Sequence, residues 1–258
     1  LNRRQFFRTS AASVGATVSY SVLANNARGD DQADRLHMVW VVDANAAKIG
    51  GGMQANATRM REVFSEIWKD RSDRFTLLER GQANRVDPGE VLDRVRGMDI
   101  AGNDSIFFYY CGHGGWSANR GGNGAGSGEE DGHFFATSGG DLYRYELRRA
   151  LLNRQLRAGI MITDCCSNIA GITPPQRRVP AEWQGFQDLF FRHRGLIDIQ
   201  AATRGQFGWS SAALDGLFTN CFTKLLCEPR SAIRQDGFDG FVSWRDFFEK
   251  LRGDTVKL

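Results

Sequence analysis

Two stretches of the sequence end in side chains that can carry out covalent chemistry. "FFYYCGHGG" (107–115) leads to His113, and "IMITDCCSN" (160–168) leads to the neighbouring cysteines Cys165 and Cys166. Neighbouring cysteines are poor disulfide partners, because the ring that they would close is strained. A thiol becomes a strong nucleophile when it ionises, and a nearby imidazole can accept its proton. The combination indicates a cysteine–histidine pair, although each dipeptide alone also fits a packing role.

Backbone amides next to these residues can stabilise the negative oxygen that forms when a carbonyl is attacked. The candidates are the amide of Gly114, just beyond the histidine, and the amide of Cys166 itself. Glycines on both sides of His113 would let the backbone approach a substrate closely.

The segments that must position these residues alternate between two kinds. Continuous apolar runs predict buried strands at 36–45, 75–80, 104–115, 133–140, 158–166 and 195–203. Helical spacing of apolar residues predicts helices at 53–70, 87–98, 141–156, 215–228 and 243–253. Asp87 is expected to cap the second helix, with Pro88 at its first position. This alternation predicts an α/β fold in which a mainly parallel central sheet lies between two helical layers.

The composition narrows the functional classes. The chain has 258 residues, of which 41% are apolar and 24% charged, as in a single large globular domain. A net charge of +3 without a run of basic residues argues against nucleic-acid binding. The five cysteines show no CxxC spacing, so no metal site is expected from them. No segment has the length of a stable membrane span.

The first 27 residues differ from the rest. Arg3-Arg4 precedes an aromatic pair, and a weakly apolar run of small residues extends from about Thr9 to Ala24. This pattern predicts a twin-arginine-type export signal over 1–27, cleaved after Ala24 or Ala27. The alternatives are a basic tail without a signal function and a cytoplasmic protein.

Three motifs carry a resemblance to a known family. "YYCGHGG" resembles the Y-x-G-H-G strand end of caspase-like peptidases, and "DCC" followed by Ser resembles the D-x-C-H-S-G box of metacaspases. "DGLFTNCFTKLL" (215–226) is similar to their G-x-F-T helix start. The likeness covers about 35–255 and suggests a bacterial metacaspase-like cysteine peptidase with a caspase-like sandwich fold.

The resemblance implies a role for several residues. His113 would be the general base and Cys166 the nucleophile, while Cys165 would fill a variable, partly buried position. Asp164 falls where metacaspases have an acidic residue in the pocket for the substrate residue before the cut, which favours Arg or Lys there. Asn56 falls where a second aspartate is usual, and its amide can still hydrogen-bond a guanidinium.

The resemblance also implies properties that this sequence carries only in part. Ser167-Asn168 replaces the His-Ser pair of the family. Many metacaspases require calcium, for which Glu129, Glu130 and Asp131 are candidates, but Thr173 stands where a further acidic residue is expected. No other cofactor is expected.

The domain 35–258 would divide as in caspases. Its expected parts are a large-subunit-like part to about residue 170, a linker over 171–184 and a small-subunit-like part over 185–258. Arg177 and Arg178 lie in the proline-containing linker and form a possible self-cleavage site.

Other functions remain open at this point. The chain could be a catalytically inactive caspase-fold domain that binds a partner, or a peptidase with a different preference before the cut. Asp164 could cap a turn, and Asp43 could orient the site or only end a strand. His37, His133 and His193 have no evident partner and are expected at the surface or in strands. The substrate would be a protein or peptide, and the oligomeric state is open.

Overall fold

The computed structural model of the chain describes most of the region after the first strand. The described residues are 19–24, 32–46, 49–69, 71, 75–80, 85–117, 132–169, 183–202, 208–210, 216–233 and 241–256. The glycine-rich stretch 118–131 and most of the linker, 170–182, lie outside them.

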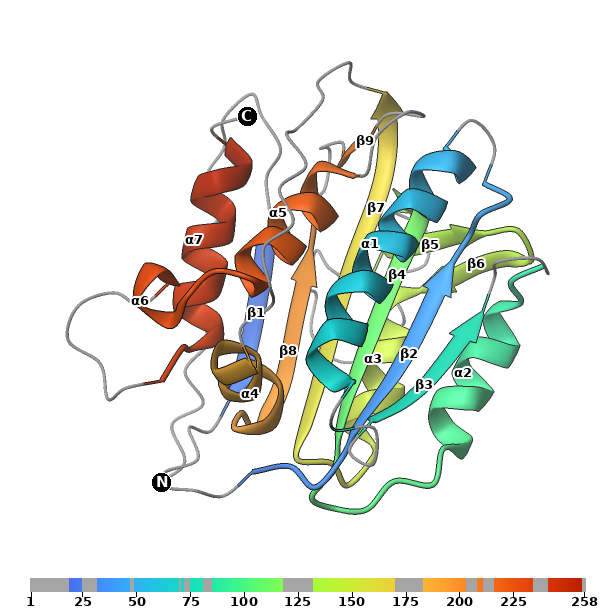
Figure 1. The fold of residues 1–258 in the computed structure, drawn as a ribbon. Coiled ribbons are helices and arrows are strands. Elements are labelled where there is room, and N and C mark those ends of the chain that lie inside the picture. Colours follow the sequence, from blue (N-terminus) through green and yellow to red (C-terminus); the bar gives the residue numbers. More distant parts are fainter. Residues whose placement is uncertain are drawn as a thin grey trace.

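Within the described residues, nine strands form one sheet (Figure 1). Their bounds are β1 (Ser19–Ala24), β2 (Leu36–Val42), β3 (Phe75–Arg80), β4 (Ser105–Trp116), β5 (His133–Thr137), β6 (Gly140–Tyr143), β7 (Ala158–Ile169), β8 (Gly195–Gln200) and β9 (Gly208–Ser210). The main path runs β1-β8-β7-β4-β2-β3, with every pair parallel except β1 with β8. The predicted α/β architecture with a mainly parallel sheet is therefore confirmed.

Helices cover both faces of this sheet, which gives three layers (Figure 1). Their bounds are α1 (Gly50–Trp68), α2 (Pro88–Gly97), α3 (Arg144–Leu152), α4 (Trp183–Phe191), α5 (Leu217–Leu226), α6 (Arg230–Ile233) and α7 (Trp244–Val256). One core cluster joins α1, α4, α5 and α7 to the sheet, and a second joins α2 and α3 to the opposite face. The aromatic residues Phe186, Phe190 and Phe191 of α4 belong to the first cluster.

Residues of β4 alternate between these two clusters. Phe107, Tyr109 and Cys111 pack on the α1/α5 face, whereas Phe108 and Tyr110 pack on the α2/α3 face. A strand covered on both faces reads as a continuous apolar run, because every side chain is buried. This is why the sequence of β4 shows no alternation of polar and apolar residues.

Local signals also explain where elements begin. Asp87 accepts hydrogen bonds from the backbone of Gly89 (2.8 Å) and Glu90 (3.2 Å), and Pro88 occupies the first turn of α2, as predicted. The strand predicted at 133–140 is present but ends at Thr137. The chain instead forms a β5–β6 hairpin whose tight turn pairs Thr137 with Gly140, and Gly140 takes a φ of 137° that favours glycine.

The segment before β2 also enters the sheet. Residues 19–24, within the stretch predicted as an export signal, form β1 and pair antiparallel with β8 along its length. None of the helices in the described part of the chain is long and apolar enough to cross a membrane.

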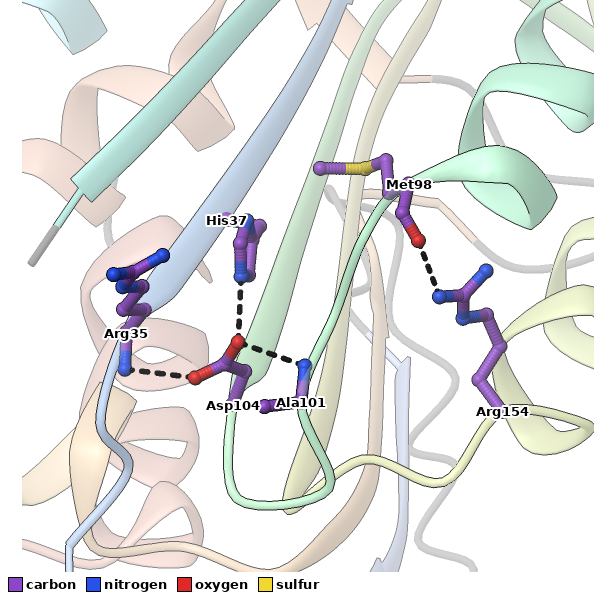
Figure 2. Close-up of polar contacts among 6 residues, drawn as sticks. All are labelled: Arg35, His37, Met98, Ala101, Asp104 and Arg154. Atoms are coloured by element: carbon purple, nitrogen blue, oxygen red, sulfur yellow. Dashed lines mark hydrogen bonds and ion pairs between the residues drawn. The ribbon is translucent and has the colours of Figure 1, made fainter.

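At the amino end of the parallel strands, one carboxylate organises the chain (Figure 2). Asp104 accepts hydrogen bonds from the backbone of Arg35 (3.1 Å) and Ala101 (3.0 Å) and bonds His37 Nε2 at 2.9 Å. The expectation that His37 has no partner is wrong, because this buried ring in β2 is held by Asp104. Asp104 thus anchors the loop before β4 to the start of β2.

His193, between α4 and β8, makes the fold sensitive to acid. Its Nε2 accepts the backbone N–H of Trp244 at the start of α7 (3.4 Å). Burial, with help from the charge of Arg157, lowers the pKa of His193 from 6.5 to about 4. Between these values the unfolded chain binds a proton that the folded chain does not, so this histidine costs stability as the pH falls through that window.

We predict that His193→Gln is less sensitive to acid than the wild type. Glutamine can still accept the Trp244 N–H but does not titrate. Between pH 7 and about pH 5, the wild type should lose about 1–2 kcal/mol more stability than the variant. Urea unfolding at the two pH values measures the difference, and equal losses in both proteins would contradict the prediction.

Candidate active site

The parallel pairing of β4 with β7 brings together the two stretches that carry the predicted chemistry. The regular register between them ends with Cys111 opposite Asp164 and Gly112 opposite Cys165. His113 and Cys166 are the next residues on the two strands. The residues predicted to form a catalytic pair therefore follow adjacent positions at the carboxyl edge of the sheet.

Both strands take a new partner at this point. His113 pairs with Ala136 of the antiparallel strand β5, and Cys166 pairs with Gly208 of β9, followed by a shift in register before Asn168. The structure describes the backbone of Cys166 but not its side chain. The His113 side chain is half-buried.

Cys165 is buried. It packs in the core cluster of the α2/α3 face, and burial raises the pKa of its thiol to about 12. A Cβ atom at Gly114 would lie 2.7 Å from the Cβ of Cys165, which is closer than real contacts allow. Glycine at 114 therefore lets the end of β4 approach β7 closely.

The strand backbone at His113 is held by a tyrosine hydroxyl. Tyr110 donates to the carbonyl oxygen of His113 at 2.7 Å and lies 3.4 Å from the carbonyl oxygen of Ala136. A Cβ atom at Gly112 would come within 2.4 Å of the same hydroxyl. The glycine before His113 is thus required for contact with Tyr110, rather than for approach to a substrate alone.

Asp164 lies on the opposite face of β7 and is buried. Its Oδ2 accepts hydrogen bonds from Asn56 Nδ2 (3.1 Å), Thr219 Oγ1 (2.7 Å) and Thr219 N (3.3 Å). The backbone N–H of Thr219 lies in the first turn of α5, where an N–H has no acceptor within the helix. Asp164 on β7 therefore caps α5 from a strand that is distant in the sequence. The helix dipole also favours a negative charge at this end.

Asn56 and Gly216 complete this network. The backbone N–H of Gly216, the residue before α5, donates to Asn56 Oδ1. Asn56 itself lies on α1 and is fully buried. All three motifs on which the family resemblance rests therefore meet within one region, together with the predicted position on α1.

The hydroxyl groups of Tyr109 and Thr219 have roles that the sequence did not predict. Tyr109 lies 2.7 Å from Thr219 Oγ1, and through it connects to Asp164. Burial raises the pKa of Tyr109 well above its usual value, so this hydroxyl stays protonated. The signal was present in the sequence, because two tyrosines in a strand buried on both faces must each find a hydrogen-bond partner.

The other cysteines are not activated. Burial raises the pKa of Cys111, where the Asp164 carboxylate adds to the effect. Burial also raises the pKa of Cys221, and that of Cys227 to about 11. Each of the four cysteines whose side chain is described is therefore a protonated thiol in the interior at neutral pH.

The remaining predicted residues lie beside this region or outside the described residues. Asp43 is buried at the end of β2, where its N–H donates to the carbonyl oxygen of Cys111 (3.1 Å) and its carboxylate accepts a hydrogen bond from the backbone of Asn45 (3.2 Å). The calcium candidates Glu129, Glu130 and Asp131, together with Thr173, Arg177 and Arg178, lie outside the described residues. The described part of the chain contains no group of three or more acidic, histidine or cysteine side chains placed to hold a metal ion.

No protein-family model matches the chain, and no curated protein matches it significantly.

We predict that Gly216→Ala destabilises the fold through the Asp164 network. A Cβ atom at this position would lie 2.4 Å from Asp164 Oδ2 and 2.8 Å from Asn56 Nδ2. Relieving that overlap should cost about 1–3 kcal/mol. The matched control is Gly253→Ala in α7, where nothing lies within 4 Å of the new atom and helix propensity should add about 0.5–1 kcal/mol. Thermal unfolding compares the two, and an unchanged Gly216→Ala protein would disprove the overlap.

Proposed function

We propose that this chain is a caspase-like cysteine endopeptidase that cleaves after Arg or Lys. The observation that carries the proposal is the register of β4 and β7, in which His113 and Cys166 directly follow the last regular pair. In parallel α/β sheets, ligands bind outside the carboxyl ends of the strands, which is where these residues lie.

The state of the other thiols supports Cys166 as the nucleophile. Cys165, its neighbour, is buried and has a pKa of about 12, so it cannot supply a thiolate at neutral pH. In the proposed reaction His113 accepts the proton of the Cys166 thiol, and the thiolate attacks the scissile carbonyl. The proton then passes to the leaving amine, and water hydrolyses the acyl-enzyme with His113 as the base.

The amides of Gly114 and Cys166 are proposed to hold the oxyanion of this intermediate. The close packing of Gly114 on Cys165 brings the end of β4 near β7, which favours two donors directed at one oxygen. No metal ion enters these steps.

The preference for a basic residue depends on Asp164. Its Oδ2 accepts hydrogen bonds from Asn56 and Thr219, so the carboxylate has a fixed position. We propose that it forms the base of the pocket and attracts a guanidinium or ammonium group, with Asn56 orienting it. The same contacts favour the alternative that Asp164 only caps α5.

Export through the leader 1–27 is part of the proposal, with a cytoplasmic protein as the alternative. An exported free thiol risks oxidation. Burial protects Cys111, Cys165, Cys221 and Cys227, and leaves Cys166 as the thiol to be tested.

We predict turnover of fluorogenic peptides ending in Arg or Lys, with loss of about 1,000-fold or more in Cys166→Ala and His113→Ala. Cys165→Ala is the matched control and should keep most of the activity, because that thiol is buried. The assay is run with calcium and with a chelator, and circular dichroism checks folding. Turnover only of peptides that end in Asp would support a peptidase but disprove the pocket for a basic residue. No turnover by a folded protein would favour the inactive binding domain.

We predict that Asp164→Asn separates recognition from capping. The amide oxygen can still accept the Thr219 N–H, so thermal stability should change little. The charge for a substrate Arg is lost, and kcat/KM for Arg peptides should fall about 10- to 100-fold relative to peptides with a neutral residue at that place. Equal losses for both peptides, with a lower melting temperature, would indicate that Asp164 acts only as a cap.

A further inference from the structure

We propose that Tyr110 is a positioning residue that orients the His113–Gly114 peptide unit and, with it, the amide that holds the oxyanion. The inference rests on the proposed function and adds to it a residue that contacts neither the substrate nor the reacting thiol. It starts from the hydrogen bond between the Tyr110 hydroxyl and the carbonyl oxygen of His113, 2.7 Å long.

The peptide geometry connects this hydrogen bond to the site. A peptide unit is planar, and none of the described peptide bonds is cis. The carbonyl of His113 and the N–H of Gly114 belong to the same plane and therefore point in opposite directions. A donor that fixes the carbonyl on one side consequently fixes the direction of the N–H on the other side. It also polarises the unit, which makes the N–H a stronger donor.

The tyrosine is held firmly enough for this role. Its ring is fully buried and stacks on Phe135 with ring centroids 4.6 Å apart and an interplanar angle of 28°. The hydroxyl lies between the carbonyls of His113 and Ala136, which pair across β4 and β5. Gly112 provides the space, since any Cβ atom there would overlap the hydroxyl at 2.4 Å.

The contact lies where β4 changes its partner. Up to Gly112, β4 pairs with β7 in the parallel ladder, and from His113 to Trp116 it pairs with the antiparallel strand β5. The His113–Gly114 peptide therefore lies outside the regular pairing with β7. The Tyr110 hydroxyl acts on this peptide together with the β5 ladder.

The test compares Tyr110→Phe, which removes only the hydroxyl, with the wild type by three measurements. The first is kcat and KM for an Arg peptide, and the second is the inhibition constant of a peptidyl-argininal. The Cys166 thiolate adds to the carbonyl carbon of this aldehyde, the C=O π pair moves to the oxygen, and the resulting oxyanion needs the same amides. The third is the pH profile of Cys166 alkylation by iodoacetamide, in which the thiolate displaces iodide and no oxyanion forms.

The expected result is a loss in kcat of about 10- to 100-fold with KM nearly unchanged. The inhibition constant of the aldehyde should rise by a similar factor, while the alkylation rate and its pH profile stay as in the wild type. Tyr145→Phe on α3, whose ring contacts Tyr143, removes a tyrosine hydroxyl elsewhere and should match the wild type in all three measurements.

Three outcomes would overturn the proposal. Wild-type kinetics in Tyr110→Phe would show that the hydroxyl does not orient the donor. Alkylation that falls together with turnover would show a general loss of site structure, which includes the case of a variant that does not fold. A wild-type chain without turnover and without fast alkylation of Cys166 would instead disprove the proposed function itself, and the role of Tyr110 with it.

Discussion

The parallel pairing of β4 with β7 is the constraint on which the rest of the site depends. Both strands are covered by helices on their two faces, so a shift of the register by one residue would move every side chain to the wrong core cluster. This cost holds Gly112 opposite Cys165 and Cys111 opposite Asp164. The relative position of the two chemically important stretches is therefore set by burial of apolar surface, over a length of strand far greater than the site itself.

Buried polar groups near this edge are satisfied separately on each face. On the α1/α5 face, Asp164 collects donors from Asn56 and Thr219, and Tyr109 joins through the Thr219 hydroxyl. On the α2/α3 face, Tyr110 bonds the His113 carbonyl. An unpaired hydroxyl or carboxylate in these positions would cost more than most single contacts contribute. These hydrogen bonds thus contribute to the stability of the fold and fix the positions of the groups at this edge.

The two ends of the parallel strands differ in how they use their polar groups. At the amino end, Asp104 is enclosed by His37 and by the backbone of Arg35 and Ala101, which closes a loop against the sheet (Figure 2). A separate polar contact holds α3 on the sheet. The side chain of Arg144, at the start of α3, bonds Thr163 of β7 at 2.5 Å and also bonds Asp198 of β8. At the carboxyl end, His113 pairs with β5 and Cys166 pairs with β9. The carboxyl edge of a parallel sheet is where α/β proteins commonly bind ligands.

The sequence by itself determined the fold class, the buried strands that lead to His113 and Cys166, and the capped start of α2. These features depend on local periodicity, apolar runs and single capping residues, which are present in the linear chain. Only the tertiary structure decided that β4 and β7 are neighbours, that 133–143 forms a hairpin, and that residues 19–24 pair with β8. It also decided the partners of His37 and of the Tyr109 hydroxyl, since each partner lies far away in the chain. Strand order and buried hydrogen bonds join residues far apart in the chain, so no local pattern specifies them.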